Sequence, residues 1–146
     1  MSTNVAVKPS LTLKRRLNAS PAKVYGAWTD PAQLARWFGP RETNPVQVDA
    51  DIRIGGHYRI RMRLSDGGEH EVGGVYRELV PNERLVFTWA WLSTPERESL
   101  VTVALKSDGA GTLLTLIHEQ FFDDAARDRH QAGWTGTLDK LEQYFA

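Results

Sequence analysis

The sequence contains no cysteine, no excess of one charge and no long apolar run. The lack of cysteine excludes a disulfide framework, a thiolate metal site and a cysteine nucleophile. Lys plus Arg and Asp plus Glu number 18 each, whereas proteins that bind nucleic acid usually carry a basic excess that neutralises phosphates. We therefore expect no nucleic acid among the partners.

Signals for membranes and export are also missing. No apolar run approaches the ~20 residues that a membrane-spanning helix requires, and residues 1–10 contain no apolar core of a secretory signal. These absences predict a cytoplasmic protein that does not insert into a membrane.

The length and composition suit one globular domain. The chain has 146 residues, of which 41% are hydrophobic and 25% charged, enough to form a core but too short for two ordinary domains. We expect a flexible N-terminal tail at 1–9 and a single domain at 10–146.

The hydrophobic pattern predicts one strand and two short helices in the first 40 residues. Alternating leucines favour a strand at 11–17. Ser20 is a suitable N-cap before Pro21, which is tolerated in a first helical turn. Asp30-Pro31 ends this helix and starts the next, which Gly39-Pro40 ends.

From Val46 onward the period changes to two, which predicts strands. Between 58 and 64, apolar side chains alternate with arginines. We expect this cationic row to be a solvated outer face with cross-strand acidic partners, the alternative being a surface for an acidic partner. The expected strands start at Val46 and continue at 58–64, 70–79, 84–92, 98–106 and 112–121. The arginines are Arg59, Arg61 and Arg63, and the acidic candidates are Asp49, Glu69, Glu71 and Glu98.

The last segment has helical periodicity. Asp123 or Asp124 can cap a helix that reaches Phe145, with an apolar stripe that includes His130, Trp134 and Leu138. One helix is ~10 Å wide, whereas seven strands at ~4.8 Å spacing are far wider, so the sheet has to curl around the helix. The order β-α-α-β6-α thus predicts an α+β helix-grip fold, a curved antiparallel sheet of about seven strands around a long C-terminal helix.

A curled sheet leaves space that bulky side chains or a ligand must fill. Side chains on the inner faces of the strands and helices are the candidates for its lining. Packing of these side chains against one another as plain core is the alternative. Gly133 and Gly136 in the last helix either permit close helix–sheet approach or leave a hollow beside Trp134. The predicted lining residues are Trp37, Tyr58, Met62, Tyr76, Phe87, Trp89, Trp91, Val103, Leu116, His118, Trp134 and Leu138.

Several segments together resemble the activator of heat shock protein 90 ATPase homologue family, within the START-like (SRPBCC) superfamily. The resemblance implies the helix-grip fold and a cavity between the sheet and the C-terminal helix. Within it, Gly55-Gly56 permits positive φ at a tight turn or bulge. We expect Asp51 and Arg53 to pair with each other or to anchor that turn, the alternative being a role in ligand binding. The matching segments are 24–31 (VYGAWTDP), 34–40 (LARWFGP), 51–58 (DIRIGGHY), 74–76 (GVY), 81–85 (PNERL), Gly111-Thr112, His118, Gly133-Trp134, Leu138 and Leu141.

The resemblance also implies a range of possible functions. Members of the superfamily bind lipids, polyketides, plant hormones or other hydrophobic molecules, and some are cyclases or hydrolases. Members named for the chaperone activator are mostly bacterial single-domain proteins without established activity. Eukaryotic activators carry a further N-terminal domain that engages the chaperone, and its absence from this sequence argues against direct chaperone activation.

The sequence offers little for catalysis. The four histidines show no metal-ligand spacing, and there is no phosphate-binding loop or nucleophile elbow. We therefore assign no catalytic residue and expect no metal or cofactor. The best candidates for acid–base catalysis are His118 and Glu119, with Glu78 and Tyr76. A lone inward histidine such as His118 more often satisfies a buried polar group.

These observations lead to one preferred function and two alternatives. The preferred function is the non-enzymatic binding of a small hydrophobic or aromatic molecule in the internal cavity. The first alternative is an enzyme of the polyketide cyclase or hydrolase type that acts through His118 or Tyr76. The second is a chaperone-linked interaction module that uses the outer face of the sheet.

Overall fold

The computed structural model describes residues 8–40, 43, 45–64 and 66–146. Residues 1–7 of the predicted tail at 1–9 lie outside this part. At the end of that tail, the Pro9 carbonyl accepts a hydrogen bond of 3.1 Å from the Phe121 N–H.

The described residues form one antiparallel sheet of seven strands in the order β1-β7-β6-β5-β4-β3-β2. All neighbouring pairs are antiparallel. The predicted element order is confirmed, and so is the helix-grip fold. The strands are β1 (Leu11–Leu17), β2 (Pro45–Ala50), β3 (His57–Arg63), β4 (Glu69–Val80), β5 (Arg84–Trp91), β6 (Ser99–Asp108) and β7 (Gly111–Glu119).

Three helices complete the domain: α1 (Pro21–Thr29), α2 (Pro31–Trp37) and α3 (Asp124–Tyr144). Each begins at a side chain that satisfies a free backbone N–H. Ser20 accepts from the Lys23 N–H at 3.3 Å, Asp30 from Ala32 at 3.0 Å, and Asp123 from Ala126 at 2.8 Å. The predicted caps Ser20 and Asp30 are confirmed, and Asp123 is the cap of the last helix.

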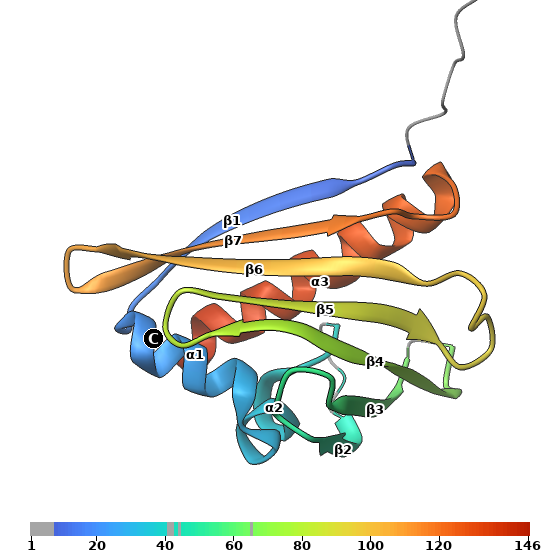
Figure 1. Ribbon diagram of the computed structural model, residues 1–146, viewed down its shortest axis with the longest axis horizontal. Coiled ribbons are helices and arrows are strands. Elements are labelled where there is room, and N and C mark those ends of the chain that lie inside the picture. The colour runs from blue at the N-terminus through green and yellow to red at the C-terminus, as the bar shows by residue number, and fades with distance from the viewer. Residues whose placement is uncertain (1–7, 41–42, 44, 65) are drawn as a thin grey trace, which may run out of the picture.

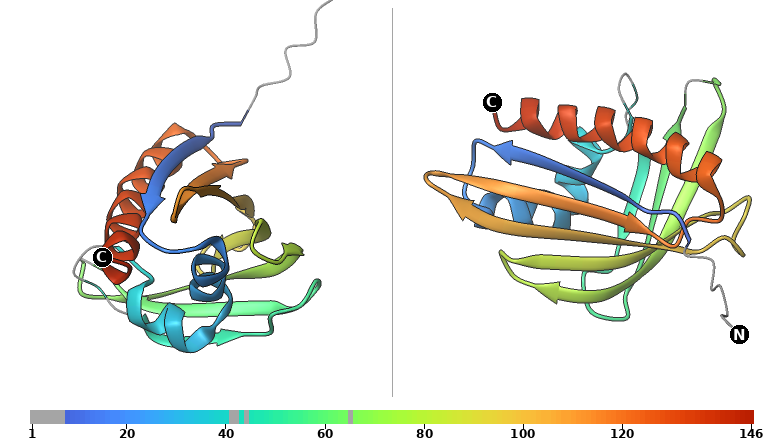
Figure 2. Two further views of the ribbon diagram at one scale, coloured as in Figure 1. Left: turned by 90° about the vertical axis from the view of Figure 1, so that its left-hand side faces the viewer. Right: turned by 90° about the horizontal axis from the view of Figure 1, so that it is seen from above.

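The sheet curls, and the helices close the gap between its two edge strands. Figures 1 and 2 show α3 running along the concave side, with α1 and α2 near the same opening. Helix α3 packs on edge strand β1, α2 packs on edge strand β2, and α2 and α3 touch each other. The core therefore lies between the concave face of the sheet and the three helices.

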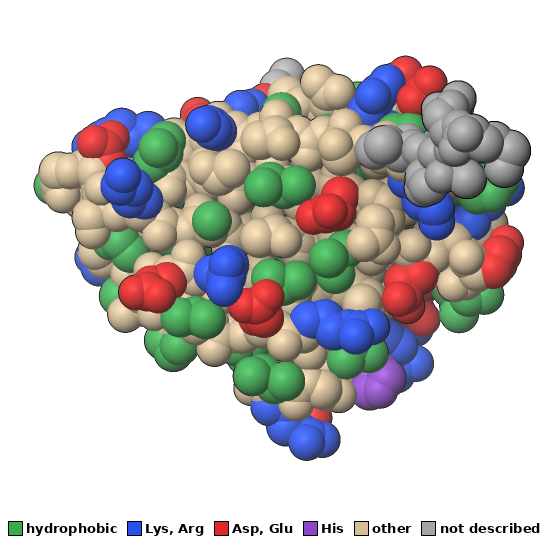
Figure 3. All heavy atoms as spheres, turned by 45° about the horizontal axis from the view of Figure 1, so that its top comes forward, with side chains coloured by type: hydrophobic (Ala, Val, Ile, Leu, Met, Phe, Trp, Pro, Cys, Tyr) green, Lys and Arg blue, Asp and Glu red, His purple; other side chains and the backbone are tan. Residues whose placement is uncertain are grey.

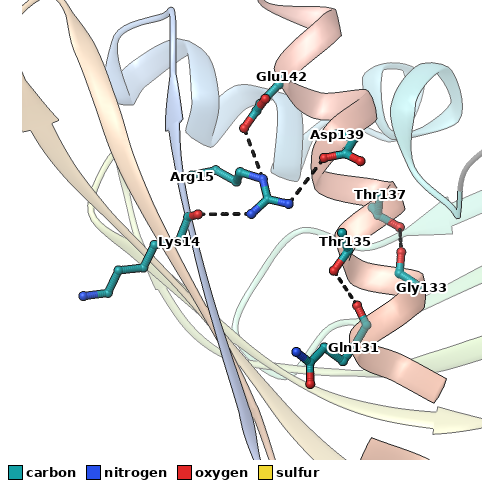
Figure 4. Close-up of polar contacts among 8 residues, drawn as sticks. All are labelled: Lys14, Arg15, Gln131, Gly133, Thr135, Thr137, Asp139 and Glu142. Carbon is teal, nitrogen blue, oxygen red and sulfur yellow. Dashed lines mark hydrogen bonds and ion pairs between the residues drawn. The ribbon is translucent and has the colours of Figure 1, made fainter. Parts of the chain in front are cut away.

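Side chains from the middle to the C-terminal end of helix α3 make two kinds of polar contact (Figure 4). Arg15, on the inward row of β1, reaches Asp139 at 3.3 Å and Glu142 at 3.1 Å. Closer to the middle of α3, Thr135 and Thr137 donate hydrogen bonds of 2.8 Å to carbonyls four residues earlier in the same helix, a bond that slightly weakens helices. The C-terminal half is thus anchored to β1 by ion pairs.

The turn between β2 and β3 agrees with its prediction. Gly55 adopts φ +84°, and the Arg53 Nε lies 2.6 Å from Asp51 Oδ2. A Cβ on Gly56 would lie 2.1 Å from the Asp51 carbonyl oxygen, so a larger residue cannot fit there. Strand β7 ends at Glu119, short of the predicted 121, because Gln120 adopts φ +66° and turns the chain toward α3.

The outer face of the sheet is solvated, as predicted. Arg63 pairs with Glu69 at 3.4 Å, and Figure 3 shows Lys or Arg and Asp or Glu side chains interspersed over the face in view. The strand register places Arg59, Arg61 and Arg63 opposite Asp49, Glu71 and Glu69. None of the helices that the structure describes is both long and apolar enough to cross a bilayer.

Candidate functional site

The interior between the sheet and α3 is packed with aromatic rings. Along β5, Leu85, Phe87 and Trp89 are buried and all face the interior, as their alternation predicts. The Trp89 and Trp134 rings are 5.1 Å apart between centroids, and Trp134 and Phe38 are 5.8 Å apart. Side chains therefore fill most of the predicted cavity.

Two small hollows remain within this packing. The inner hollow has a volume of about 20 Å³ and the outer hollow about 50 Å³. Trp28, Leu34, Phe38, Tyr58, Ile60, Tyr76, Leu85, Phe87 and Trp89 line the inner hollow. Phe38, Gly39, Pro40, Met62, Trp89, Trp91, His130, Gly133, Trp134 and Thr137 line the outer hollow.

Phe38 and Trp89 line both hollows and so form the wall between them. Their ring centroids are 6.3 Å apart. Trp89 belongs to β5, whereas Phe38 follows the last residue of α2 and precedes Gly39, which adopts φ +110°. Lys140 on α3 donates a hydrogen bond of 3.4 Å to the Phe38 carbonyl. The Phe38 side chain itself is 3% exposed and packs against the rings of Trp28, Trp37, Trp89 and Trp134.

Seven of the twelve predicted lining residues border a hollow. The other five are buried in the surrounding core and line neither hollow. Trp37 faces α1, where its indole donates to the Ala27 carbonyl at 3.0 Å. The seven are Tyr58, Tyr76, Phe87, Trp89, Met62, Trp91 and Trp134, and the five are Trp37, Val103, Leu116, His118 and Leu138.

Gly133 belongs to the hollow rather than to a close helix–sheet contact. A Cβ built on Gly133 would meet no atom within 4 Å, and the residue lines the outer hollow beside Trp134. Of the two explanations that the sequence offered for this glycine, the structure supports the hollow. Gly136, one turn further on, is buried.

His118 has protein partners on both ring nitrogens. The Trp134 indole N–H donates to Nδ1 at 2.9 Å, and Nε2 lies 2.7 Å from Ser99 Oγ. Ser99 donates its own proton to the Trp89 carbonyl at 3.1 Å, so Nε2 carries the imidazole proton and donates to Ser99. Burial, with a smaller contribution from repulsion by His130, lowers the pKa of His118 to about 2. The imidazole is therefore neutral near pH 7 and has no free lone pair for proton transfer.

His130 accepts hydrogen bonds from two further indoles. Its Nε2 accepts from the Trp89 N–H at 3.2 Å and from the Trp91 N–H at 3.0 Å, while Nδ1 donates to the Ala126 carbonyl at 2.7 Å. Burial lowers the pKa of His130, which favours the neutral form that these bonds require. Three tryptophan tips are thus held by two neutral histidines.

Trp28 differs from these three tryptophans. It is 2% exposed and lines the inner hollow, and its Nε1 is the one buried side-chain polar atom without a hydrogen-bond partner in the described part of the chain. An unpaired buried donor costs about 1–3 kcal/mol. Trp28 therefore lines the inner hollow and carries an indole N–H that no described protein group accepts.

The remaining acid–base candidates do not form a catalytic group. Glu78 pairs with Arg84 at 2.8 Å at the surface. Burial raises the pKa of Tyr76 well above its usual value, so its hydroxyl stays protonated near neutral pH. Among the described residues no group of three or more His, Cys, Asp or Glu could hold a metal ion.

Sequence reasoning missed several residues of this site. Gly39 and Pro40 were predicted to end a helix, Phe38 was named only within the family segment 34–40, and His130 only as a member of the apolar stripe of α3. One sequence feature indicated the wall between the two hollows: the bulky Phe38 stands directly before Gly39, which ends the helix. Nothing in the sequence shows that the Trp28 tip lacks a partner, because this depends on packing.

The comparisons with known proteins agree with the fold. A protein from Chromobacterium violaceum is 30% identical, with a TM-score of 0.83 over 93% of this chain and 96% of its own. The AHSA1 protein from Silicibacter pomeroyi is also 30% identical, with a TM-score of 0.82 over the same shares. CalU16 from Micromonospora echinospora is 27% identical, with a TM-score of 0.72 over 94% of this chain and 76% of its own.

No curated protein matches the chain significantly. The family model described as "Activator of Hsp90 ATPase homolog 1-like protein" matches residues 18–146, nearly the whole of the described domain. The chain therefore belongs to the family of activator of Hsp90 ATPase homolog 1-like proteins, within the START-like superfamily.

Proposed function

We propose that this protein binds a small hydrophobic or aromatic molecule between the sheet and α3, in the space that Phe38 and Trp89 divide into two hollows. The observation that carries the proposal is the unpaired Trp28 N–H beside the inner hollow. An aromatic molecule with a hydroxyl or carbonyl oxygen would supply the missing acceptor, and its rings would suit the apolar wall.

A single water molecule accounts less well for Trp28. The inner hollow is large enough for one water, but a buried water needs two to four polar partners. The Tyr58 hydroxyl already donates to the Thr88 carbonyl at 2.5 Å, and most of the wall is apolar. A ligand that is polar at one end matches this distribution better.

The hollows must widen to admit such a ligand. Their volumes of about 20 and 50 Å³ are far below the roughly 300–1,000 Å³ of ordinary ligand sites. Rotation of the Phe38 side chain would merge the two, because Phe38 forms half of the wall between them. The proposed site is thus closed without a ligand and opens at Phe38.

The two alternatives draw less support from the geometry. His118 is sealed by Ser99 and Trp134, which leaves the cyclase or hydrolase alternative without its main proton-transfer group. The chaperone-linked alternative relies on the outer face, where charges of both signs are interspersed (Figure 3). Neither alternative explains the unpaired Trp28 donor.

The test is titration of 2-naphthol, a neutral aromatic alcohol, into the wild-type protein and Phe38→Ala by calorimetry. Phe38→Ala should lower the free energy of unfolding by about 3 kcal/mol. It should also bind 2-naphthol about tenfold more tightly, since about 1.4 kcal/mol spent on moving the ring is no longer needed. Phe122→Ala is the matched control, because Phe122 is 59% exposed and lines neither hollow.

The control should keep wild-type affinity and stability. If neither the wild-type protein nor Phe38→Ala binds 2-naphthol, or if Phe38→Ala binds no better than Phe122→Ala, the proposed site is wrong.

A further inference from the structure

A surface groove of about 360 Å³ adjoins the outer hollow. Among the described residues, Pro40, Trp91, His130 and Gly133 line both spaces and therefore lie between them. The groove lies between the first half of α3 and the loop that connects β5 with β6. A molecule that entered the outer hollow past Gly133 would leave its outer end in this groove.

The groove carries positive charge. Arg97 and Arg129 both line it, and no lining residue among those that the structure describes is acidic. His70 also lines the groove, but its Nε2 already lies 2.9 Å from Asp66 Oδ2. The two arginines are therefore the groups that set the charge preference of the groove.

Neither arginine forms an ion pair with an acidic side chain of the described residues. The Arg97 guanidinium lies 3.9 Å from the centroid of the Phe122 ring, a contact that leaves its edge available for hydrogen bonds. Asp128, next to Arg129 in sequence, accepts from the Arg127 Nε at 2.9 Å. Six of the other ten described arginines do pair with acids, namely Arg15, Arg16, Arg53, Arg63, Arg84 and Arg127.

We infer that the ligand of this protein is an amphipathic organic anion, an aromatic body with a carboxylate that Arg97 and Arg129 bind in the groove. Guanidinium groups bind carboxylates through charge-assisted, often bidentate hydrogen bonds. The inference rests on the proposed function, since the aromatic body occupies the hollows. It adds the charge of the ligand and the direction in which it lies: the carboxylate is outermost and the neutral oxygen innermost, at Trp28.

The test compares 2-naphthol with 6-hydroxy-2-naphthoate, which has the same rings and hydroxyl plus a carboxylate at the far end. The carboxylate should improve affinity about tenfold at low salt. Arg97→Gln with Arg129→Gln should abolish this preference without changing the affinity for 2-naphthol. The control is Arg59→Gln with Arg77→Gln, which removes the same charge from exposed positions on β3 and β4 and should keep the preference.

A second measurement needs no variant. Raising the salt concentration of the wild-type protein should weaken binding of 6-hydroxy-2-naphthoate and leave 2-naphthol unchanged, because salt screens exposed charges. If 2-naphthol binds but the carboxylate adds nothing, or if both arginine pairs have the same effect, the inference is overturned and the proposed function stands. If neither compound binds, the proposed function fails and the inference fails with it. Arginine-dependent binding to anionic phosphatidylglycerol vesicles without any carboxylate preference would also overturn it, in favour of a membrane surface.

Discussion

The indole N–H of Trp134 donates a hydrogen bond to His118, whereas the indole N–H of Trp28, across the aromatic cluster, has no hydrogen-bond partner among the described residues. The two rings are only 6.2 Å apart between centroids, and both are almost fully buried. Burial alone therefore does not distinguish them. The polar tip does, because the Trp134 tip completes a closed network, whereas the Trp28 tip has no acceptor among the described residues.

The difference extends to the surroundings of each tryptophan. On the histidine side, Ser99, His118 and Trp134 leave no donor or acceptor of the imidazole unused. On the other side, Trp28 lies beside a hollow whose wall includes Phe38, which is followed by a residue at positive φ. The first region is a fully satisfied hydrogen-bond network, whereas the second combines a small hollow with an unpaired donor.

The largest expected effect comes from breaking the histidine region. His118→Leu leaves the Trp134 N–H and the Ser99 hydroxyl without their partner in the core, which should lower the free energy of unfolding by about 3–5 kcal/mol. Urea denaturation followed by circular dichroism measures this. Adding Trp134→Phe to His118→Leu should cost less than the sum of the two single changes. Strict additivity would show that the hydrogen bond contributes little.

A drop in pH should weaken the same region. Unfolded His118 takes up a proton near its ordinary pKa of 6.5, but in the folded protein burial holds its pKa at about 2. Between these values the unfolded state binds more protons, so stability is complete above pH 6.5 and falls as the pH decreases.

From pH 7 to pH 5 the loss from His118 should be about 2 kcal/mol. His130, whose pKa is also lowered by burial, adds to the loss in the same direction. Urea denaturation at several pH values between 7 and 5 measures it. A flat profile over this range would mean that neither histidine is held neutral by the fold.

The smallest effect compares the two tryptophans directly. Trp28→Phe and Trp134→Phe delete the same atoms from similarly buried sites, but only the second change leaves an acceptor, His118 Nδ1, unpaired. Trp134→Phe should therefore be the more destabilising of the two, by about 1–2 kcal/mol. Thermal unfolding of the two variants side by side measures the difference, and equal losses would remove the distinction between the two regions.

The fold was predictable because its signals are local and repeated. Phe87 and Trp89 on β5 were correctly predicted to lie inside, and Ser20 and Asp30 marked the starts of helices that the structure confirms. The site was predictable only in part. Alternation along a strand shows which face of the sheet Val103 and Leu116 occupy. It does not show that these residues lie in a region filled by neighbouring side chains.

The contacts that define the site join residues far apart in the chain. His130 meets Trp89 and Trp91 about 40 residues away, and no spacing rule predicts this pairing. Phe38 sits where a helix ends, so it belongs to no periodic pattern. The missing partner of Trp28 is a property of the whole interior, and no single segment of the sequence encodes it.

Trp28 is the residue proposed to bind the polar end of the ligand, and its indole N–H can be observed directly. The protein has five tryptophans, so a ¹H–¹⁵N spectrum should contain five indole cross-peaks, assigned by Trp→Phe substitutions. Saturation with 2-naphthol should move the Trp28 cross-peak downfield as its N–H gains an acceptor, while the Trp134 cross-peak, already hydrogen-bonded to His118, moves little. If 2-naphthol binds and the Trp28 cross-peak stays in place, or if Trp134 moves as far, the central claim is contradicted.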